Sequence, residues 1–384
     1  MTSSTEPPSF RDKPDGPLDA RWRAAREGGQ EAVLPSGRVA VSCSAPFGHG
    51  GLGRHLQEIV DALARREQQA ICICDSLDLP VAAAADRDLR MRSLAVAAVP
   101  LARLSPAWRA WRKSVAFDAD GARRLPAADH LIAFSGQALA QFRAARRQQY
   151  RSISLMSATT HLRRVVRQHA RAYRQYPLER SWASRLLRRS LVEYAEADRI
   201  YVSSRYSWES FVEEGVAEEA MSLFPLIPAP RFGPGRTTRA SATFDIVYVG
   251  GLSVAKGVPL LIDAVRRLSH ADMRLVLVGG AGTRGMRRFI ESARARDSRI
   301  EVSPGDPLPH VRGARLCVHP SYSDGFGYSP AEALACGLPV IVSEDTGMKD
   351  LIDSGRDGLI LPTGDLGALT EAIDCAYRGE ILGG

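Results

Sequence analysis

The sequence predicts an α/β protein made of two doubly wound parallel-sheet domains that face each other across a cleft. Three observations carry this prediction. Short apolar runs alternate with helical patterns along the chain, and such alternation is typical of a parallel sheet covered by helices on both faces. The length of 384 residues exceeds one typical hydrophobic core and is enough for two. Residues 228–243 hold three Pro and two Gly without periodicity, as linkers do.

In the first half, apolar runs bounded by turn residues predict strands at Arg38–Cys43, Ala70–Cys74, His130–Phe134, Ser152–Met156 and Ile200–Ser203. Helical periodicity predicts helices at Arg54–Arg66 and Ser207–Glu214, and a basic helical region at Leu162–Ala197 that breaks near Pro177. In the second half, strands are predicted at Asp245–Val249, Arg274–Val278, Ile300–Val302, Arg315–Val318, Val340–Val342 and Gly358–Leu361. Helical patterns alternate with them, the last at Leu366–Tyr377.

These elements predict four segments. Residues 1–36 form a polar, disordered segment, 37–228 the first Rossmann-like domain, 229–243 the linker and 244–384 the second Rossmann-like domain. The polar N-terminus has no apolar stretch of the kind that a secretory signal needs. No apolar run approaches the roughly eighteen residues of a spanning helix. The six cysteines are scattered, mostly in apolar contexts, as buried reduced thiols are, and a cytoplasmic location fits.

The most informative stretch is Ser321–Ser343, in which Asp324 and Glu332 lie eight residues apart. The turn between them consists of Gly325, Phe326 and Gly327. Pro330 follows, and Pro is tolerated in the first turn of a helix. The pattern predicts a strand, a glycine loop that holds Asp324, a helix that holds Glu332 and another strand. Both carboxylates can therefore face a ligand over the helix N-terminus, where N–H groups favour anions.

A second motif that suits the binding of a phosphate group lies in Ile246–Ala264. Its pattern predicts a strand, then a glycine turn followed by Lys256, and then a helix. The chain contains only four lysines, and Arg dominates elsewhere. A Lys at the mouth of a strand–turn–helix unit suits phosphate oxygens, because an ammonium group is a compact point charge. Gly279 and Gly280 end the next predicted strand.

These motifs resemble the signature of the family 4 retaining glycosyltransferases, which have the GT-B fold. The shared features are two acidic residues separated by seven, the Gly-Phe-Gly turn, the later Glu-Ala, Gly, Pro-Val-Ile and Ser, and a Gly-x-Leu-x-x-x-Lys-Gly stretch. The resemblance covers about residues 38–375 and is strongest in the second half. It departs at two positions: the family usually has Glu where this chain has Asp324, and often Arg where it has Gly251.

The resemblance implies transfer of a sugar from a nucleotide-sugar to a hydroxyl, with retention and without a metal or other cofactor. Lys256 would contact the donor diphosphate, Asp324 the sugar hydroxyls and Glu332 the ribose. The glycines that would line the donor site, beside the Gly325–Gly327 turn with Phe326, are Gly251, Gly279 and Gly280. The family is thought to use front-face attack, in which the leaving phosphate takes the acceptor proton. Members usually continue with a further helix beyond the position of Gly384.

An alternative function comes from Gly48–Gly53, which satisfies G-x-G-x-x-G between a predicted strand and a helix, with Asp75 about twenty residues on. This fingerprint favours an NAD-dependent oxidoreductase, although Ala45–Phe47 separates the strand from the first Gly, where a tight turn is expected. The family resemblance instead implies that Gly50 and Gly51 line the donor-phosphate or acceptor pocket. A non-catalytic nucleotide-sugar-binding protein is a third possibility.

His161 follows a predicted strand and precedes the basic helix. Family members place a His in this loop near the donor sugar, so the resemblance implies a catalytic role, with capping or packing as the alternative. Asp118 and Asp120 match the metal-binding D-x-D motif of GT-A glycosyltransferases, but flanking Arg residues and the lack of a preceding apolar strand predict a polar loop. No cluster elsewhere has metal-ligand spacing, so no metal is expected.

The net charge of +8 is unevenly distributed. Residues 101–190 hold nineteen Arg and Lys and four acidic residues, a net charge of +15, with Trp108, Trp111 and Trp182 interleaved. This pattern predicts contact with an anionic membrane surface, to which each basic residue contributes about 1 kcal/mol, and a solvated helix face is the alternative. The protein would then be cytoplasmic and peripheral on the inner face of the membrane, with a lipid-linked or glycan acceptor. No nucleic-acid motif accompanies the charge, so no nucleic-acid partner is expected.

Overall fold

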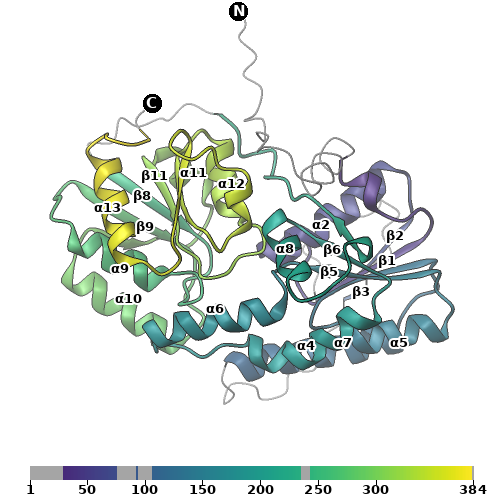
Figure 1. Cartoon of the computed structure of the whole chain (residues 1–384). Helices are drawn as coiled ribbons and strands as arrows, with labels where there is room; N and C mark the ends of the chain where they lie inside the picture. The colour runs from purple at the N-terminus through teal and green to yellow at the C-terminus, as the bar shows by residue number, and fades with distance from the viewer. Residues whose placement is uncertain (1–28, 76–91, 94–105, 235–242, 383–384) are drawn as a thin grey trace, which may run out of the picture. The chain divides into compact units, whose positions relative to one another are not determined.

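A computed structural model describes residues 29–75, 92–93, 106–234 and 243–382 (Figure 1). These residues form two compact units, each with one parallel sheet. Among the described residues, unit 1 comprises 167–180, 227–234 and 243–382. Unit 2 comprises the described residues up to 166 together with 181–226. The predicted α/β class with two parallel sheets is confirmed.

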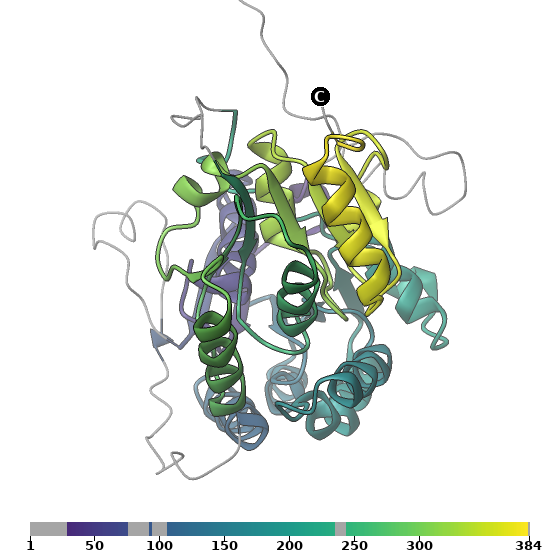
Figure 2. The ribbon, with the colours of Figure 1, turned by 90° about the vertical axis from the view of Figure 1, so that its left-hand side faces the viewer.

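The sheet of unit 1 has the strand order β10-β9-β8-β11-β12-β13. Its strands are β8 (Phe244–Val249), β9 (Met273–Val278), β10 (Ile300–Val302), β11 (Leu316–His319), β12 (Val340–Ser343) and β13 (Gly358–Leu361). Its helices are α9 (Val258–Arg267), α10 (Arg284–Arg296), α11 (Leu308–Gly313), α12 (Tyr328–Ala335) and α13 (Leu366–Tyr377), with the short turn η4 (Gly347–Asp350). In Figure 2 the yellow α13 faces the viewer, and it packs against α9.

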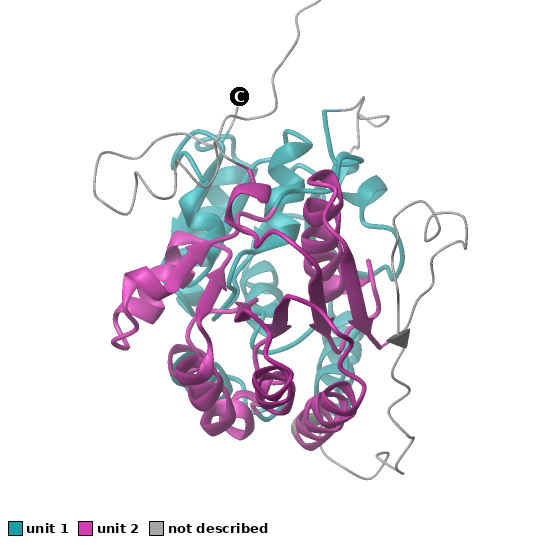
Figure 3. Cartoon of the chain, turned by 90° about the vertical axis from the view of Figure 1, so that its right-hand side faces the viewer, with its two compact units in different colours: residues 1–13, 167–180, 227–384 teal, residues 14–166, 181–226 magenta. Residues whose placement is uncertain are grey.

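The sheet of unit 2, magenta in Figure 3, has the order β3-β2-β1-β4-β5-β6-β7. Its strands are β1 (Val39–Cys43), β2 (Ala70–Cys74), β3 (Arg92–Ser93), β4 (His130–Phe134), β5 (Ser152–Ser157), β6 (Arg199–Val202) and β7 (Met221–Leu223). The helices are α2 (Gly50–Arg65), α4 (Pro106–Arg123), α5 (Leu139–Arg147), α6 (Leu162–Gln175), α7 (Ala183–Glu196) and α8 (Arg205–Val212), with the short turns η1 (Glu31–Val33) and η3 (Glu218–Ala220). The division between the units falls inside α6.

Both sheets contain a topological switch point, where the strand order reverses. In unit 1 it lies between β8 and β11, and in unit 2 between β1 and β4. Ligands of open parallel sheets bind outside the carboxyl ends of the strands at this point. The loops that follow these four strands are therefore the favoured places for a site.

Residues 167–180 lie within the predicted first domain, yet they pack in unit 1. Ala172 is fully buried in the core of that unit. The hydroxyl of Tyr176 donates to Asp263 at 3.0 Å, and the hydroxyl of Tyr322 donates to Gln175 at 2.5 Å. Helical periodicity predicted the helix, but it does not tell which sheet the far end of the helix contacts.

Residues 29–36 belong to the segment that was predicted to be disordered, and that prediction is wrong for them. Gln30 is buried and donates to Glu58 at 2.7 Å and to the carbonyl oxygen of Pro225 at 2.8 Å. A polar composition does not reveal such long-range hydrogen bonds. Residues 1–28 lie outside the described residues, as do residues 235–242 of the predicted linker.

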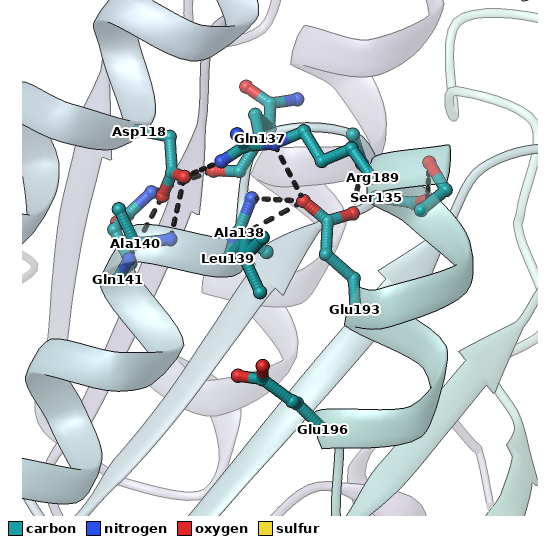
Figure 4. Close-up of polar contacts among 12 residues, drawn as sticks. Asp118, Ser135, Gln137, Ala138, Leu139, Ala140, Gln141, Arg189, Glu193 and Glu196 are labelled. Carbon is teal, nitrogen blue, oxygen red and sulfur yellow. Dashed lines mark hydrogen bonds and ion pairs between the residues drawn. The ribbon is translucent and has the colours of Figure 1, made fainter. Parts of the chain in front are cut away.

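Asp118 and Asp120 lie on helix α4, so the predicted polar loop is wrong. Asp118 is fully buried and accepts hydrogen bonds from the amides of Ala140 at 2.7 Å and Gln141 at 3.0 Å, and one from Arg189 (Figure 4). The carboxylate of Asp118 therefore accepts hydrogen bonds from backbone amides in the first turn of α5. The surrounding arginines concealed this role, because they suggested a solvated loop.

Glu193, on α7, completes the same arrangement (Figure 4). Its carboxylate accepts from the amides of Gly136 at 2.5 Å, Ala138 at 2.9 Å and Leu139 at 3.2 Å, and from Nε of Arg189 at 3.2 Å. Burial raises the pKa of Glu193, and these amides and Arg189 oppose the shift. Five amide N–H groups at the start of α5 thus donate hydrogen bonds to two buried carboxylates. The guanidinium group of Arg189 contacts both carboxylates.

Candidate functional site

Lys256 and Asp324 meet at the switch point of unit 1. Lys256 lies in the loop between β8 and α9, and Asp324 in the loop between β11 and α12. Nζ of Lys256 is 2.5 Å from Oδ2 of Asp324. The two residues are 68 positions apart in the chain, and the parallel pairing of β8 with β11 places them together. The structure therefore places the Lys256 motif, which the sequence suggested for phosphate binding, in contact with the acidic motif that contains Asp324.

His319 is a second partner of Asp324, and sequence reasoning missed it. It is the last residue of β11, and its Nε2 lies 3.0 Å from Oδ2 of Asp324. Its ring stacks on Tyr248 with 6.0 Å between centroids and a 4° interplanar angle. The hydroxyl of Tyr248 donates to the carbonyl oxygen of Gly251 at 3.0 Å. The signal that could have found His319 is its place at the end of the strand that precedes the acidic loop.

The electrostatics of this site favour an ionised Asp324. Burial acts to raise its pKa, but the ammonium group of Lys256 and the hydrogen bond from His319 outweigh that effect and hold the pKa of Asp324 well below its usual range. A carboxylate is an acceptor only, so Nε2 of His319 is the donor in this contact. Lys256 and Asp324 thus neutralise each other in the site.

Two glycines allow the loops of the site to approach through their backbones. Gly257 has φ +71°, and an added Cβ would lie 1.9 Å from the carbonyl oxygen of Pro320. Gly279 has φ +154°, and an added Cβ would lie 1.9 Å from the carbonyl oxygen of Gly250. Only Gly tolerates both conditions. The loops after β8, β9 and β11 are consequently held in direct contact.

Gly257→Ala is expected to lower the free energy of unfolding of unit 1 by roughly 1–3 kcal/mol, because Ala is strained at this φ and its methyl group meets Pro320. Gly251→Ala is the matched control, since an added Cβ there meets no heavy atom within 4 Å. Denaturant unfolding followed by far-UV circular dichroism measures both. Equal stability of the two variants would contradict the close approach.

The other predicted donor-binding residues lie around the same loops. Glu332, in the second turn of α12, is 2% exposed. Gly327 is the N-cap residue of α12, and the ring of Phe326 meets that of Tyr328 edge-on at 5.4 Å. An added Cβ at Gly280 would meet no heavy atom within 4 Å. The structure thus brings these residues to one edge of the sheet, and their contacts with a donor stay predictions.

In unit 2, Gly50 and Gly51 begin helix α2, and an added Cβ at either would meet no heavy atom within 4 Å. The loop that leads to them is tied to the loop after β4, because the amide of Ser44 donates to Oε1 of Gln137 at 2.6 Å. These two loops flank the switch point of unit 2. The predicted pocket-lining role of the two glycines stays a prediction.

His161 also belongs to unit 2, whereas Lys256 and Asp324 belong to unit 1. It is 3% exposed, and its amide donates to Oγ of Ser210 at 2.8 Å. Its ring lies 4.8 Å from that of Tyr194 and 5.1 Å from that of Phe211. These contacts are those of a packing residue, and the catalytic role of His161 stays a prediction.

The basic segment is ion-paired at several points. Arg163 lies 3.1 Å from Glu214, and Arg164 lies 2.7 Å from Glu213. Arg143 pairs in the same way with Glu196 at 2.9 Å. These acids lie outside residues 101–190, so the count of charges within that segment overstated its free positive charge.

Three further findings concern the described residues. No helix in the described part of the chain is long and apolar enough to cross a membrane. Within those same residues, no three His, Cys, Asp or Glu side chains gather closely enough to hold a metal ion. A cavity of about 770 Å³ in unit 1 is lined by Thr243, Arg315 and Pro339, which precede β8, β11 and β12. It therefore lies at the opposite edge of the sheet from Lys256 and Asp324.

Residues 243–378 match the family model described as "Glycosyl transferases group 1". This part of the chain is similar to that family. The matched region of this chain contains Lys256, His319, Asp324 and Glu332. The resemblance seen in the sequence motifs is therefore confirmed for the second half of the chain.

Individual relatives share 30% or less of their sequence with this chain over the aligned residues. The D-inositol 3-phosphate glycosyltransferase of Mycobacteroides abscessus is 28% identical over 189 residues, which cover 44% of this chain and 42% of that protein. The chain thus spans less than half the length of this curated relative. Among solved structures, sucrose-phosphate synthase from Thermosynechococcus elongatus has a TM-score of 0.66 at 20% identity, with 90% of each chain covered. Anabaena HepE, solved in complex with UDP-glucose, has a TM-score of 0.64 at 16% identity, with 89% of this chain and 90% of that chain covered. These likenesses confirm the predicted fold.

Proposed function

We propose that this protein transfers a sugar from a nucleotide-sugar to a hydroxyl acceptor, with retention and without a metal ion. The observation that supports the proposal most is the contact between Lys256 and Asp324 at the switch point of a group 1 glycosyltransferase domain. The reaction needs a cation where the leaving diphosphate gains negative charge. It also needs a hydrogen-bond acceptor that binds the hydroxyls of the donor sugar and orients that sugar. These two side chains supply both at one place.

In the proposed reaction, the bond between the anomeric carbon and the phosphate oxygen breaks, and the acceptor oxygen bonds to the same face of the sugar. The leaving diphosphate takes the proton of the acceptor hydroxyl, so no enzymic nucleophile is required. Lys256 stabilises the charge that develops on the diphosphate, because a positioned cation needs no reorganisation at the moment of reaction. Asp324 binds sugar hydroxyls, and Glu332 binds the ribose of the nucleotide.

The acceptor in this proposal is a lipid-linked molecule or a glycan in polysaccharide or glycolipid assembly, used in the cytoplasm at the inner face of the membrane. The net charge of residues 101–190 supports this choice. The ion pairs of Arg163 and Arg164 weaken that support, because they reduce the charge available to a lipid surface.

A nucleoside diphosphate is expected to stabilise the protein in the presence of a metal chelator, and NAD is not. UDP, GDP and ADP are compared in a thermal-shift assay, since a ligand at 100 times its Kd stabilises a protein by about 2.7 kcal/mol. Stabilisation by NAD alone would favour an oxidoreductase that uses Gly48–Gly53. Binding of a nucleotide-sugar without release of a nucleoside diphosphate in the presence of acceptor hydroxyls would favour a non-catalytic binding protein.

A further inference from the structure

We propose that Asp324 competes with the donor diphosphate for Lys256, so that the site discriminates between the nucleotide-sugar and the free nucleoside diphosphate. The inference rests on the proposed function and deepens it. An ammonium group that is bound to a carboxylate is a weaker phosphate ligand, and the carboxylate itself repels a phosphate nearby. A ligand that binds Lys256 must therefore displace Asp324 or share the cation with it.

The geometry makes such an exchange possible. Oδ2 of Asp324 accepts from two donors, Nζ of Lys256 at 2.5 Å and Nε2 of His319 at 3.0 Å. The side chain of Lys256 is 33% exposed and that of Asp324 is 18% exposed, whereas that of His319 is only 5% exposed. The ion pair thus lies where a ligand can reach it. The imidazole lies behind it, stacked on the fully buried Tyr248.

This asymmetry predicts which partner Asp324 keeps. Lys256 has a flexible stem and can turn to a phosphate, while His319 is buried and stacked on Tyr248. Asp324 then stays on His319 and gains a sugar hydroxyl in place of the ammonium group. A nucleotide-sugar offers that hydroxyl, but a free nucleoside diphosphate does not. The ion pair consequently disfavours the product relative to the donor and favours product release.

The test measures the affinity of the nucleoside diphosphate that most stabilises the wild-type protein, by isothermal titration calorimetry. Asp324→Asn is expected to bind it about two- to fivefold more tightly, the range for loss of a partly exposed ion pair. The same variant is expected to bind the matching nucleotide-sugar no more tightly than wild type. The preference for the nucleotide-sugar over the diphosphate should therefore fall.

Two controls separate competition for Lys256 from a general loss of negative charge. Asp345→Asn removes a neighbouring carboxylate, whose Oδ2 accepts from Gln168 at 2.8 Å, and should leave the diphosphate affinity unchanged. In a Lys256→Met background, Asp324→Asn should no longer raise that affinity. A double-mutant cycle of this kind isolates the coupling between the two residues.

His319→Phe provides a test of opposite sign that does not depend on the folding of Asp324→Asn. Phe can keep the stacking on Tyr248 but has no hydrogen-bond donor for Asp324. Of the two side-chain donors described for the Asp324 carboxylate, only Lys256 then remains. The diphosphate is expected to bind about two- to fivefold more weakly to this variant. The inference would be overturned, and the proposed function left standing, if Asp324→Asn bound the nucleoside diphosphate no more tightly than wild type. The same holds if Asp324→Asn raised the diphosphate affinity equally in the Lys256→Met background. Absence of diphosphate binding in wild type would overturn the proposed function and the inference with it.

Discussion

Lys256→Met is expected to lower kcat by roughly 10²–10³, which corresponds to the loss of one positioned electrostatic contact in the transition state. Met has a similar length and keeps the packing of the stem, but it carries no charge for the leaving diphosphate. Lys256 follows a glycine turn in the sequence and lies at the switch point of the sheet. The release of nucleoside diphosphate from the donor that the wild-type protein uses is the measurement.

Lys113→Met is the matched control for this prediction. Lys113 also pairs with an aspartate, Asp75, at 2.7 Å, and its side chain is 39% exposed, close to the 33% of Lys256. The chemical change is therefore the same, but it lies in unit 2 beside the alternative nucleotide fingerprint. A large loss of activity in Lys113→Met with little loss in Lys256→Met would contradict the proposed donor site.

Glu193→Gln is expected to lower the free energy of unfolding of unit 2 by about 3–5 kcal/mol, the range for removal of one partner from a buried charged network. The amide of Gln keeps one acceptor oxygen, but its NH₂ group would face backbone N–H donors at the start of α5. Arg189 would also lose one of its two carboxylates. The effect should therefore be far larger than that of an ordinary surface substitution.

Tryptophan fluorescence during denaturant unfolding is suited to this measurement, because every tryptophan among the described residues belongs to unit 2, namely Trp108, Trp111, Trp182 and Trp208. Glu196→Gln is the matched control, three residues further along α7. Glu196 forms a partly exposed pair with Arg143, so its loss should cost only about 0–1 kcal/mol. Equal stability of the two variants would refute the proposed weight of the buried network.

Much of the fold could be predicted from local sequence. The bounds of β2, β4, β10, β13 and α13 agree with the prediction residue for residue, because each is an apolar or amphipathic run that ends at turn residues. The same local information pointed to Lys256 and Asp324, since glycine turns after strands mark the carboxyl edge of a sheet. Such signals need only the few residues around each position.

Only the tertiary structure decided which residues far apart in the chain contact each other. Strand order placed Lys256 beside Asp324, and it gave His319 a partner that no sequence pattern announced. Asp118 resembled a solvated acid among arginines, yet it caps α5 from inside the protein. Residues 167–180 showed helical periodicity, which fixes an apolar face but not the sheet that covers it. Periodicity records which residues avoid water, while the choice of partner depends on matching shapes and hydrogen-bonding groups that only the folded chain brings together.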